Sequence, residues 1–507
     1  MRPEVTRRRV LQVATLGAVA TVAGGVGTWE SLVAPWIGSA SAPGDGFDHA
    51  SDDVLREPAQ LVSADGVLEV DLTAGIGVTL AGRRTRALGY NGTSPGPTLR
   101  VAPGDVLRVS LTNDLGQTTN LHTHGLHVSP QGRGDDVLRM VEAGHRAGYE
   151  YAIPGDHPTG TFWYHPHHHG LVAQQVFGGL FGAIVVAPAG QTPPVRERVL
   201  VVSDTTLTSD GQVAQVSQQQ VMAGREGDLL LVNGQLRPRI DLAEAGPERW
   251  RVVNACASRF LDLALDEHTL GLLGYDGQSL ADPEERSSVV LAPGNRADLL
   301  VRPDASGSFT LRTLGYDRGG MGMMMNGRVG RSAETELATL RVPAGSSMAT
   351  GSASLTPGWI GASGASDDLR GLAVDGHRTI TFTMGMGGGM GMGGGMTFGF
   401  DGLEFSPDRV DQQVDLGTVE EWTLVNASPM AHPFHLHVWP MQIVAAEDPL
   451  ASARPDWRDV VIVPPWAQVT VRVRFADFAG RTVYHCHVLD HEDHGMMGLI
   501  QALPSSP

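Results

Sequence analysis

The sequence predicts an all-β protein made of three consecutive β-sandwich domains. Gly and Pro are abundant, at 65 and 31 of 507 residues, whereas only 18% of the residues are charged. From Leu61 onward, short alternating runs such as VLEVDLTAGIGVTLAG are separated by Gly, Pro, Asn and Asp. This pattern is typical of short strands joined by turns. The chain is also too long for one ordinary hydrophobic core.

Two repeated elements give the number of domains. GTFWYHPH at residues 160–167 aligns with GRTVYHCH at 480–487, and GSFTLRTL at 307–314 has the same strand pattern without His. A second element ends in Asn three times: LRVSLTN at Asn113, WRVVN at Asn254 and WTLVN at Asn426. Internal repeats of this kind indicate copies of one structural unit. We therefore expect domains at 61–190, 191–345 and 370–507, with linkers at 43–60 and 346–369.

The first 42 residues are expected to be an export signal. TRRRVLQ at residues 6–12 resembles the twin-arginine motif, an apolar stretch follows to about Val26, and Ala40–Ser41–Ala42 is a plausible cleavage site. This segment predicts recognition by the twin-arginine export machinery and a periplasmic, cell-envelope or secreted location. An uncleaved membrane anchor is the alternative. No other stretch is long and apolar enough to span a bilayer, so we expect no membrane span in the mature chain.

Charge and cysteine content exclude other classes. The formal net charge of −18 disfavours a nucleic-acid partner, because phosphate contacts require a basic surface. There are two cysteines, Cys256 and Cys486. If Cys486 binds a metal, no intrachain disulfide remains, and we expect Cys256 to be a buried structural thiol.

The segment VYHCHVLDHEDHGMMG, at residues 483–498, carries the strongest chemical signal. Side chains alternate along a strand, so His485 and His487 should point to one face and Cys486 to the other. The thiolate of Cys486, the imidazole of His491 and the thioether of Met496 are the ligand types of a blue copper centre. One strand would then serve two metal sites, one on each face.

Three further histidine clusters supply the missing ligands: His122 with His124, His165 with His167, and His432 with His435 and His437. A spacing of two residues places both rings of a pair on one face, whereas His432 lies three residues before His435 and turns elsewhere. His432 can therefore complete the Cys486 site. The eight remaining histidines are His122, His124, His165, His167, His435, His437, His485 and His487. They come equally from the first and third domains and suit about three copper ions at the interface of these domains, with open positions for dioxygen. Zinc is the rival metal, but structural zinc takes four ligands and does not use Met.

The four clusters resemble those of the three-domain multicopper oxidases, the bacterial laccase-like and cuprous-oxidase-like group, over nearly the whole mature chain. The resemblance implies cupredoxin-like Greek-key domains and about four copper ions per chain: one type 1, one type 2 and two type 3. The implied type 1 ligands are His432, Cys486, His491 and axial Met496. The implied type 2 ligands are His122 and His435, and the implied type 3 ligands are His124, His165, His167, His437, His485 and His487.

The resemblance also implies a reaction, in which four one-electron oxidations of a substrate are coupled to the reduction of O2 to two waters. Dioxygen reduction consumes protons, so carboxylates near the cluster should act as donors. Glu492 matches the family's acidic position, and Asp135 is the second candidate, with Asp136 as its alternative.

The substrate is predicted from Met-rich segments. Soft thioethers prefer Cu(I), and residues 319–327 and 384–396 combine Met with Gly in what we expect to be mobile surface loops. The candidate substrate-binding residues are Met384, Met386, Met390, Met392, Met396 and, by resemblance to cuprous-oxidising relatives, Met430. Those relatives have an Asp where Ser428 stands here. Small phenolic or aromatic reductants, including bilirubin-like pigments, are the alternative substrates, and a non-catalytic copper-sequestering protein is the alternative function.

Overall fold

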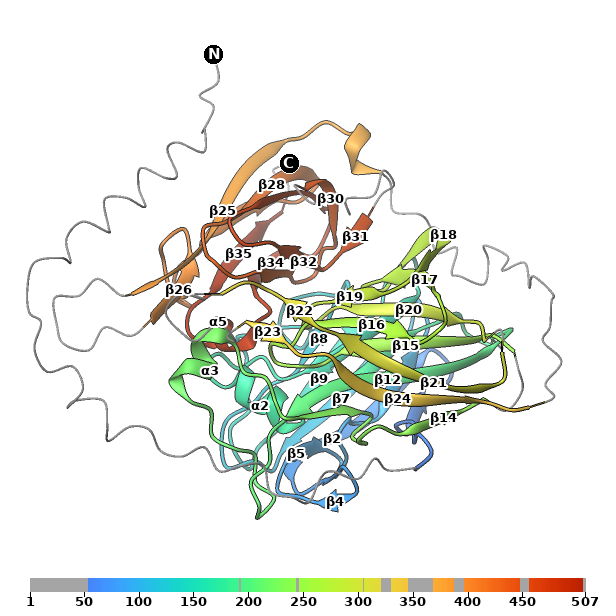
Figure 1. Cartoon of the computed structure of the whole chain (residues 1–507). Coiled ribbons are helices and arrows are strands. Elements are labelled where there is room, and N and C mark those ends of the chain that lie inside the picture. The colour runs from blue at the N-terminus through green and yellow to red at the C-terminus, as the bar shows by residue number, and fades with distance from the viewer. Residues whose placement is uncertain are drawn as a thin grey trace, which may run out of the picture. The chain divides into compact units, whose positions relative to one another are not determined.

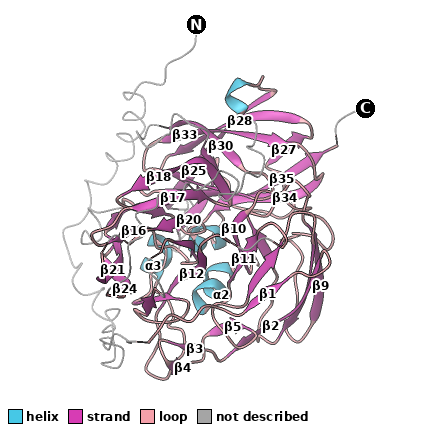
Figure 2. Cartoon of the chain, turned by 90° about the vertical axis from the view of Figure 1, so that its right-hand side faces the viewer, coloured by secondary structure: helices cyan, strands magenta, loops and turns pink. Residues whose placement is uncertain are grey.

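The computed structural model describes residues 53–190, 193–242, 246–303, 305–320, 330–344, 368–386, 396–446 and 456–504. All of them belong to one compact unit, His49–Pro507. Their regular structure is almost entirely β-strand, with a few short helices (Figure 2), which confirms the all-β prediction. In this part of the chain, none of the helices combines the length and apolarity needed to cross a membrane. The predicted export signal and most of the linker at 346–369 lie outside the described residues.

The first pair of sheets contains the first two histidine clusters. The order of its five-stranded sheet is β1 (Gln60–Val62), β6 (Thr98–Val101), β11 (Gly182–Val186), β10 (Gly160–His165) and β8 (His122–His124). The four-stranded sheet has the order β5 (Leu88–Tyr90), β2 (Val67–Ile76), β7 (Val106–Asn113) and β9 (Arg146–Ala152), and a small hairpin joins β3 (Thr79–Leu80) to β4 (Arg83–Arg84). Burial alternates along β2 and β7, because every second side chain faces the core. Leu72, Leu107 and Phe162 meet in this core.

The second pair of sheets is larger. Its six-stranded sheet has the order β13 (Leu229–Val232), β12 (Arg196–Thr205), β15 (Glu248–Asn254), β20 (Arg296–Val301), β17 (Leu270–Tyr275) and β18 (Gln278–Arg286). The five-stranded sheet has the order β14 (Arg239–Asp241), β24 (Thr335–Val342), β21 (Gly307–Leu314), β16 (Leu261–Leu265) and β19 (Val289–Leu291). A separate ribbon pairs β22 (Tyr316–Asp317) with β23 (Arg331–Ser332).

The third pair of sheets, orange to red in Figure 1, contains Cys486. Its six-stranded sheet has the order β26 (Met396–Phe400), β25 (Gly376–Met386), β28 (Thr418–Asn426), β33 (Gln468–Phe475), β30 (Met441–Ala446) and β31 (Asp456–Arg458). The five-stranded sheet has the order β27 (Gln412–Asp415), β35 (Met497–Leu503), β34 (Gly480–Cys486), β29 (His432–Leu436) and β32 (Val460–Val463).

The repeated Asn has the same role in each pair of sheets. The side-chain amide of Asn113 donates to the carbonyl of Val141, that of Asn254 to Leu291 and that of Asn426 to Val463. In all three cases, the side-chain oxygen accepts the backbone N–H two residues further on. These shared bonds support three copies of one unit, while the residue boundaries of the domains stay a prediction.

Three short α-helices, α2 (Val172–Gly178), α3 (Gln218–Ala223) and α5 (Leu489–Asp493), lie together (Figure 1), and a 3-10 turn covers Leu369–Gly371. From α5, the carboxylate of Asp493 accepts the backbone N–H groups of Gly170, Val172 and Ala173 at the start of α2. Asp490 of the same helix accepts from the backbone and guanidinium of Arg225. Helix α5 is therefore tied to both of the preceding pairs of sheets.

Two sequence predictions differ from the structure. Residues 53–60 fall in the predicted linker, yet Leu55 is buried in the middle core and its N–H donates to the carbonyl of Arg239. The run at 384–396 was expected to form no strand, but β25 continues to Met386 and β26 begins at Met396. Antiparallel pairing of the two strands, with Met384 opposite Phe398, offsets the low strand propensity of Gly there. Residues 387–395 and 321–329 lie outside the described residues.

We predict that Asn254→Ala destabilises the middle pair of sheets. The variant leaves the buried carbonyls of Arg259 and Leu291 without their donor, which costs about 1–3 kcal/mol. The corresponding fall in melting temperature, about 2–12 °C, is measurable by circular dichroism. Gln212→Ala is the control, because this exposed amide bonds only to Asp210 at the surface. Equal melting temperatures for the two variants would contradict the role assigned to Asn254.

Candidate metal centre

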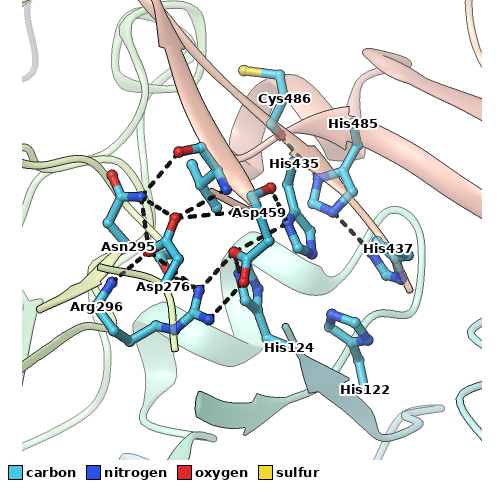
Figure 3. Close-up of polar contacts among 12 residues, drawn as sticks. His122, His124, Asp276, Asn295, Arg296, His435, His437, Asp459, His485 and Cys486 are labelled. Carbon is cyan, nitrogen blue, oxygen red and sulfur yellow. Dashed lines mark hydrogen bonds and ion pairs between the residues drawn. The ribbon is translucent and has the colours of Figure 1, made fainter. Parts of the chain in front are cut away.

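Strand β34 places Cys486 and His485 on opposite sides of one sheet. Its neighbour β29 runs antiparallel, with Phe434 opposite Cys486 and His435 opposite His485. Cys486 accordingly points away from the rings of His435 and His485 (Figure 3). The strand alternation expected from the sequence is therefore present, and every residue of β34 from Thr482 to Cys486 is buried.

Cys486 lies in a compact buried cluster with His432 and His491. Its sulfur is 3.3 Å from His432 Nδ1 and 3.9 Å from His491 Nδ1, and the two nitrogens are 3.3 Å apart. Met496 is fully buried beside them, and its carbonyl accepts the Cys486 N–H. Burial raises the pKa of the Cys486 thiol, so a metal that displaces its proton would be needed to produce a thiolate here.

The outer nitrogens of the two imidazoles in this cluster are held in place. Ser428 Oγ is 2.8 Å from His432 Nε2, and His491 Nε2 is 3.2 Å from the carbonyl oxygen of Met222, which lies in α3. The ring of Phe398 stacks on His491 with centroids 4.4 Å apart. Both rings therefore turn Nδ1 towards Cys486. Cys256, by contrast, is a buried free thiol in the middle core, as predicted.

The other eight histidines converge between the first and third pairs of sheets. They are His122, His124, His165, His167, His435, His437, His485 and His487, and all are buried. The rings of His122 and His437 stack with centroids 4.0 Å apart, and those of His124 and His435 stack at 3.8 Å. The Nε2 atom of His485 lies 3.1 Å from that of His167 and 3.2 Å from that of His437. Imidazoles from the first and third pairs of sheets thus form one buried cluster, the eight-histidine cavity.

Several of these rings are anchored on one nitrogen and have an unpaired nitrogen on the other side. His122, His165 and His435 bond through Nδ1 to Asp135, Pro166 and Asp459 respectively. Their Nε2 atoms are buried and have no hydrogen-bond partner among the described residues. Burial and the neighbouring rings lower the pKa of each, which keeps the imidazoles neutral. Neutral rings fixed from behind are the ligands that copper and zinc prefer, and eight of them exceed any single zinc site.

Two carboxylates contact the eight-histidine cavity directly. Asp135 Oδ2 is 2.8 Å from His122 Nδ1 and 3.6 Å from His437 Nδ1, while Glu492 Oε2 is 2.9 Å from His485 Nδ1. Burial raises the pKa of both carboxyl groups to about 7. Asp136 is only half-buried; it lines a surface pocket of about 430 Å³. Of the two sequence candidates, Asp135 therefore lies against the histidines and Asp136 does not.

The sequence reasoning missed two charged residues at the cavity. Asp459 contacts His124 and His435, and Arg296 holds Asp459 from the middle pair of sheets. The sequence contained one indication of the role of Arg296. This residue begins RADLLV, an otherwise mostly apolar strand that is buried along its entire length. A charge in such a strand requires a buried partner.

The methionine candidates are placed unequally. Met430 is buried and its backbone bridges to Gly319, where the first Met-rich segment begins. Met384 is half-buried against the core of the third pair of sheets. Met386 and Met396 end β25 and begin β26, and Met390 and Met392 lie outside the described residues.

Three family models described as multicopper oxidase match residues 74–191, 160–328 and 379–506. Together they cover most of the chain and all four histidine clusters. The protein belongs to the multicopper oxidase family. The oxidases of this family use copper to couple the oxidation of reducing substrates to the reduction of O2.

Named relatives extend the comparison. The chain is 25% identical over 429 residues to a multicopper oxidase of Staphylococcus haemolyticus, covering 82% of this chain and 84% of the relative. It is 25% identical over 479 residues to a laccase of Bacillus stratosphericus (82% and 90%) and 25% identical over 437 residues to the cell division protein FtsP of Proteus mirabilis (83% and 86%). The solved structure of a Campylobacter jejuni multicopper oxidase, described as a metallo-oxidase, superposes with a TM-score of 0.74 at 27% identity, covering 89% of this chain and 95% of that one.

Proposed function

We propose that the protein is a copper-dependent oxidase that removes single electrons from a reductant near Cys486 and delivers four of them to O2 at the eight-histidine cavity. The observation that carries this proposal is the position of Cys486, the last residue of β34, directly between His485 and His487 in the chain. The backbone on either side of Cys486 then provides two short covalent routes, through His485 and through His487, from the thiolate site to the eight-histidine site. A protein that only stores copper has no need of this connection.

The ligand assignment is the one that the family resemblance implies for these side chains. The mononuclear, type 1 site would take His432, Cys486 and His491, with Met496 as the axial ligand. The type 2 ion would take His122 and His435, and the type 3 pair would take His124, His165, His167, His437, His485 and His487. About four copper ions per chain would supply one-electron transfer and the reduction of O2.

The chain's own carboxyl groups would move the protons. Reduction of one O2 to two waters consumes four electrons and four protons, and the cavity is closed to bulk solvent. Glu492 Oε2 beside His485 and Asp135 Oδ2 beside His122 are the carboxylates placed to deliver them. Asp135 also accepts from the Thr123 backbone N–H, which fixes its orientation.

For the substrate, we propose Cu(I) first and small phenolic or aromatic reductants second. The bridge between Gly319 and buried Met430 brings the start of one Met-rich segment next to His432, and thioethers favour Cu(I). Ser428, which contacts His432, provides a hydroxyl where cuprous-oxidising relatives have a carboxylate, so this position lacks the charged ligand of a tight Cu(I) site.

We further propose that residues 1–42 direct export through the twin-arginine route, on the basis of TRRRVLQ.

We predict that Cys486→Ser abolishes the blue colour and the oxidase activity and leaves the fold intact, because a hydroxyl does not replace a copper-bound thiolate. Visible absorption, oxygen consumption and circular dichroism measure the three properties. Cys256→Ser is the matched control and should retain its colour, since Cys256 lies in the middle core. Turnover by the Cys486→Ser variant would show that electrons take another route.

We predict that Glu492→Gln slows O2 reduction by about 100-fold or more, because the amide holds the same position without carrying a proton. Anaerobic bleaching of the blue colour by reductant should keep its rate, and reoxidation by O2 should become slow in stopped-flow measurements. Asp136→Asn, at the half-buried neighbouring position, should leave both rates unchanged. Equal reoxidation rates in all three proteins would exclude Glu492 as a donor.

We predict that replacing Met390 and Met392 together with Leu lowers Cu(I) oxidation several-fold and leaves phenol oxidation unchanged. Leu preserves chain length and apolar character but removes the soft sulfur ligand. Parallel kinetics on both substrates with fully metallated protein provide the measurement.

Steady oxygen consumption by the parent protein would exclude the alternative function, copper sequestration, because a sequestering protein takes up metal once and then stops.

A further inference from the structure

The middle pair of sheets contributes no histidine to either site, yet one of its turns reaches the eight-histidine cavity. The turn between β19 and β20 carries Gly294 and Asn295 and leads into Arg296, the first residue of β20. Arg296 is fully buried and donates through Nη1 and Nη2 to the two carboxylate oxygens of Asp459, each at 2.6 Å. Its remaining bonds run to the carbonyls of Thr161, in the first pair of sheets, and of Gly294. One guanidinium therefore joins all three pairs of sheets.

Asp459 transmits this contact to two metal-ligand candidates. Its Oδ1 atom lies 3.1 Å from His124 Nε2, and its carbonyl oxygen accepts from His435 Nδ1 at 2.8 Å. The carboxylate lies between the Arg296 guanidinium on one side and the two stacked rings on the other (Figure 3). Asp459 therefore orients one ring from the first pair of sheets and one from the third.

Asp276 fixes the backbone of Asp459 from behind. Its carboxylate accepts the backbone N–H groups of Asp459 and Val460 at 3.3 and 3.2 Å, and also the side-chain amide of Asn295 and the N–H of Arg296. Asn295 donates in addition to the carbonyl of Val460 at 3.1 Å. Both the side chain and the main chain of Asp459 are thus held by the middle pair of sheets.

Two glycines show how closely these groups approach the histidines. A Cβ atom at Gly125, directly after His124, would collide with the Arg296 guanidinium and the Asp459 carboxylate. A Cβ atom at Gly294 would lie within 3.0 Å of the His487 ring. Both glycines also have positive φ, at 84° and 87°. The chain thus leaves no space between the middle turn and the ligand set.

We propose that Arg296 is a positioning residue for the trinuclear copper site, acting through Asp459 on His124 and His435. This inference rests on the proposed function, because it concerns the same cavity. The bidentate fork matters, since a carboxylate held at both oxygens keeps its plane and direction, whereas an ammonium at this place makes a point contact. The ligand-free middle unit accordingly helps to set the geometry of a metal site formed by the other two.

The test compares Arg296→Lys and Asp459→Asn with a matched control, Arg251→Lys. Arg251 is likewise buried, pairs with Asp298 at 3.0 Å and contacts the side chain of Thr161, but no contact joins it to a candidate ligand. Each protein is loaded with copper. The copper content, the affinity in competition with a chelator, the blue absorption and the electron paramagnetic resonance signal of the non-blue copper are then measured.

We expect Arg296→Lys and Asp459→Asn to keep the blue colour. Both variants should bind copper at the eight-histidine site about 10- to 100-fold more weakly and should shift the electron paramagnetic resonance signal of the non-blue copper. The double variant should be little worse than either single variant, because both act on one contact. Arg251→Lys should match the parent in all copper readouts. If Arg296→Lys fails to fold, Asp459→Asn alone decides, since it preserves size and one acceptor oxygen.

A parent-like copper affinity and non-blue signal in Asp459→Asn would overturn the proposal, as would an equal loss in Arg251→Lys. The proposed oxidase function fails separately. A parent protein that binds four copper ions but consumes no O2 with either reductant would refute the reaction, whereas the comparison of copper affinities would still stand.

Discussion

The structure depends on the alternation of side chains along β34 and its register with β29. Because successive residues of a strand face opposite sides, Cys486 and its two histidine neighbours cannot share a site. The antiparallel partner repeats this division, with His432 reaching Cys486 and His435 lying opposite His485. A slip of one residue between these two strands would move each candidate ligand to the wrong face. The two buried sites thus require a single register, which the cores on either side of the sheet maintain.

A second constraint arises from burial. Eight neutral imidazoles and three carboxyl groups with raised pKa are buried together, and their desolvation opposes folding. The cost is offset where a ring bonds outward to a carboxylate or a carbonyl, as the rings of His122, His124 and His435 do. Asp135 provides such a bond to His122, and Asp459 provides one to His124. Residues outside the set of candidate ligands therefore determine how the candidate ligands are oriented.

Sequence alone predicted much of this arrangement, because the candidate ligands lie in short motifs whose spacing determines the direction of each side chain. Spacings of two and three residues determined which face each histidine takes, and repeated motifs revealed three related units. The role of Asp459 and Arg296 could not be predicted, since 163 residues separate them and neither belongs to a His cluster. The Met and Gly run was misjudged at its ends because cross-strand pairing with Phe398 overrides weak local propensity. The choice between Asp135 and Asp136 needed coordinates, as adjacent residues on one turn differ only in direction.

Helix α5 has a further consequence for how this family can diverge. Four successive residues of one short turn each engage something different: Asp490 a guanidinium, His491 a thiol, Glu492 an imidazole and Asp493 the backbone of another helix. Inserting or deleting one residue there would rotate every later side chain by about 100° and exchange all of these partners at once. Single substitutions around helix α5 can therefore be tolerated one at a time, whereas the number of residues in the helix cannot change.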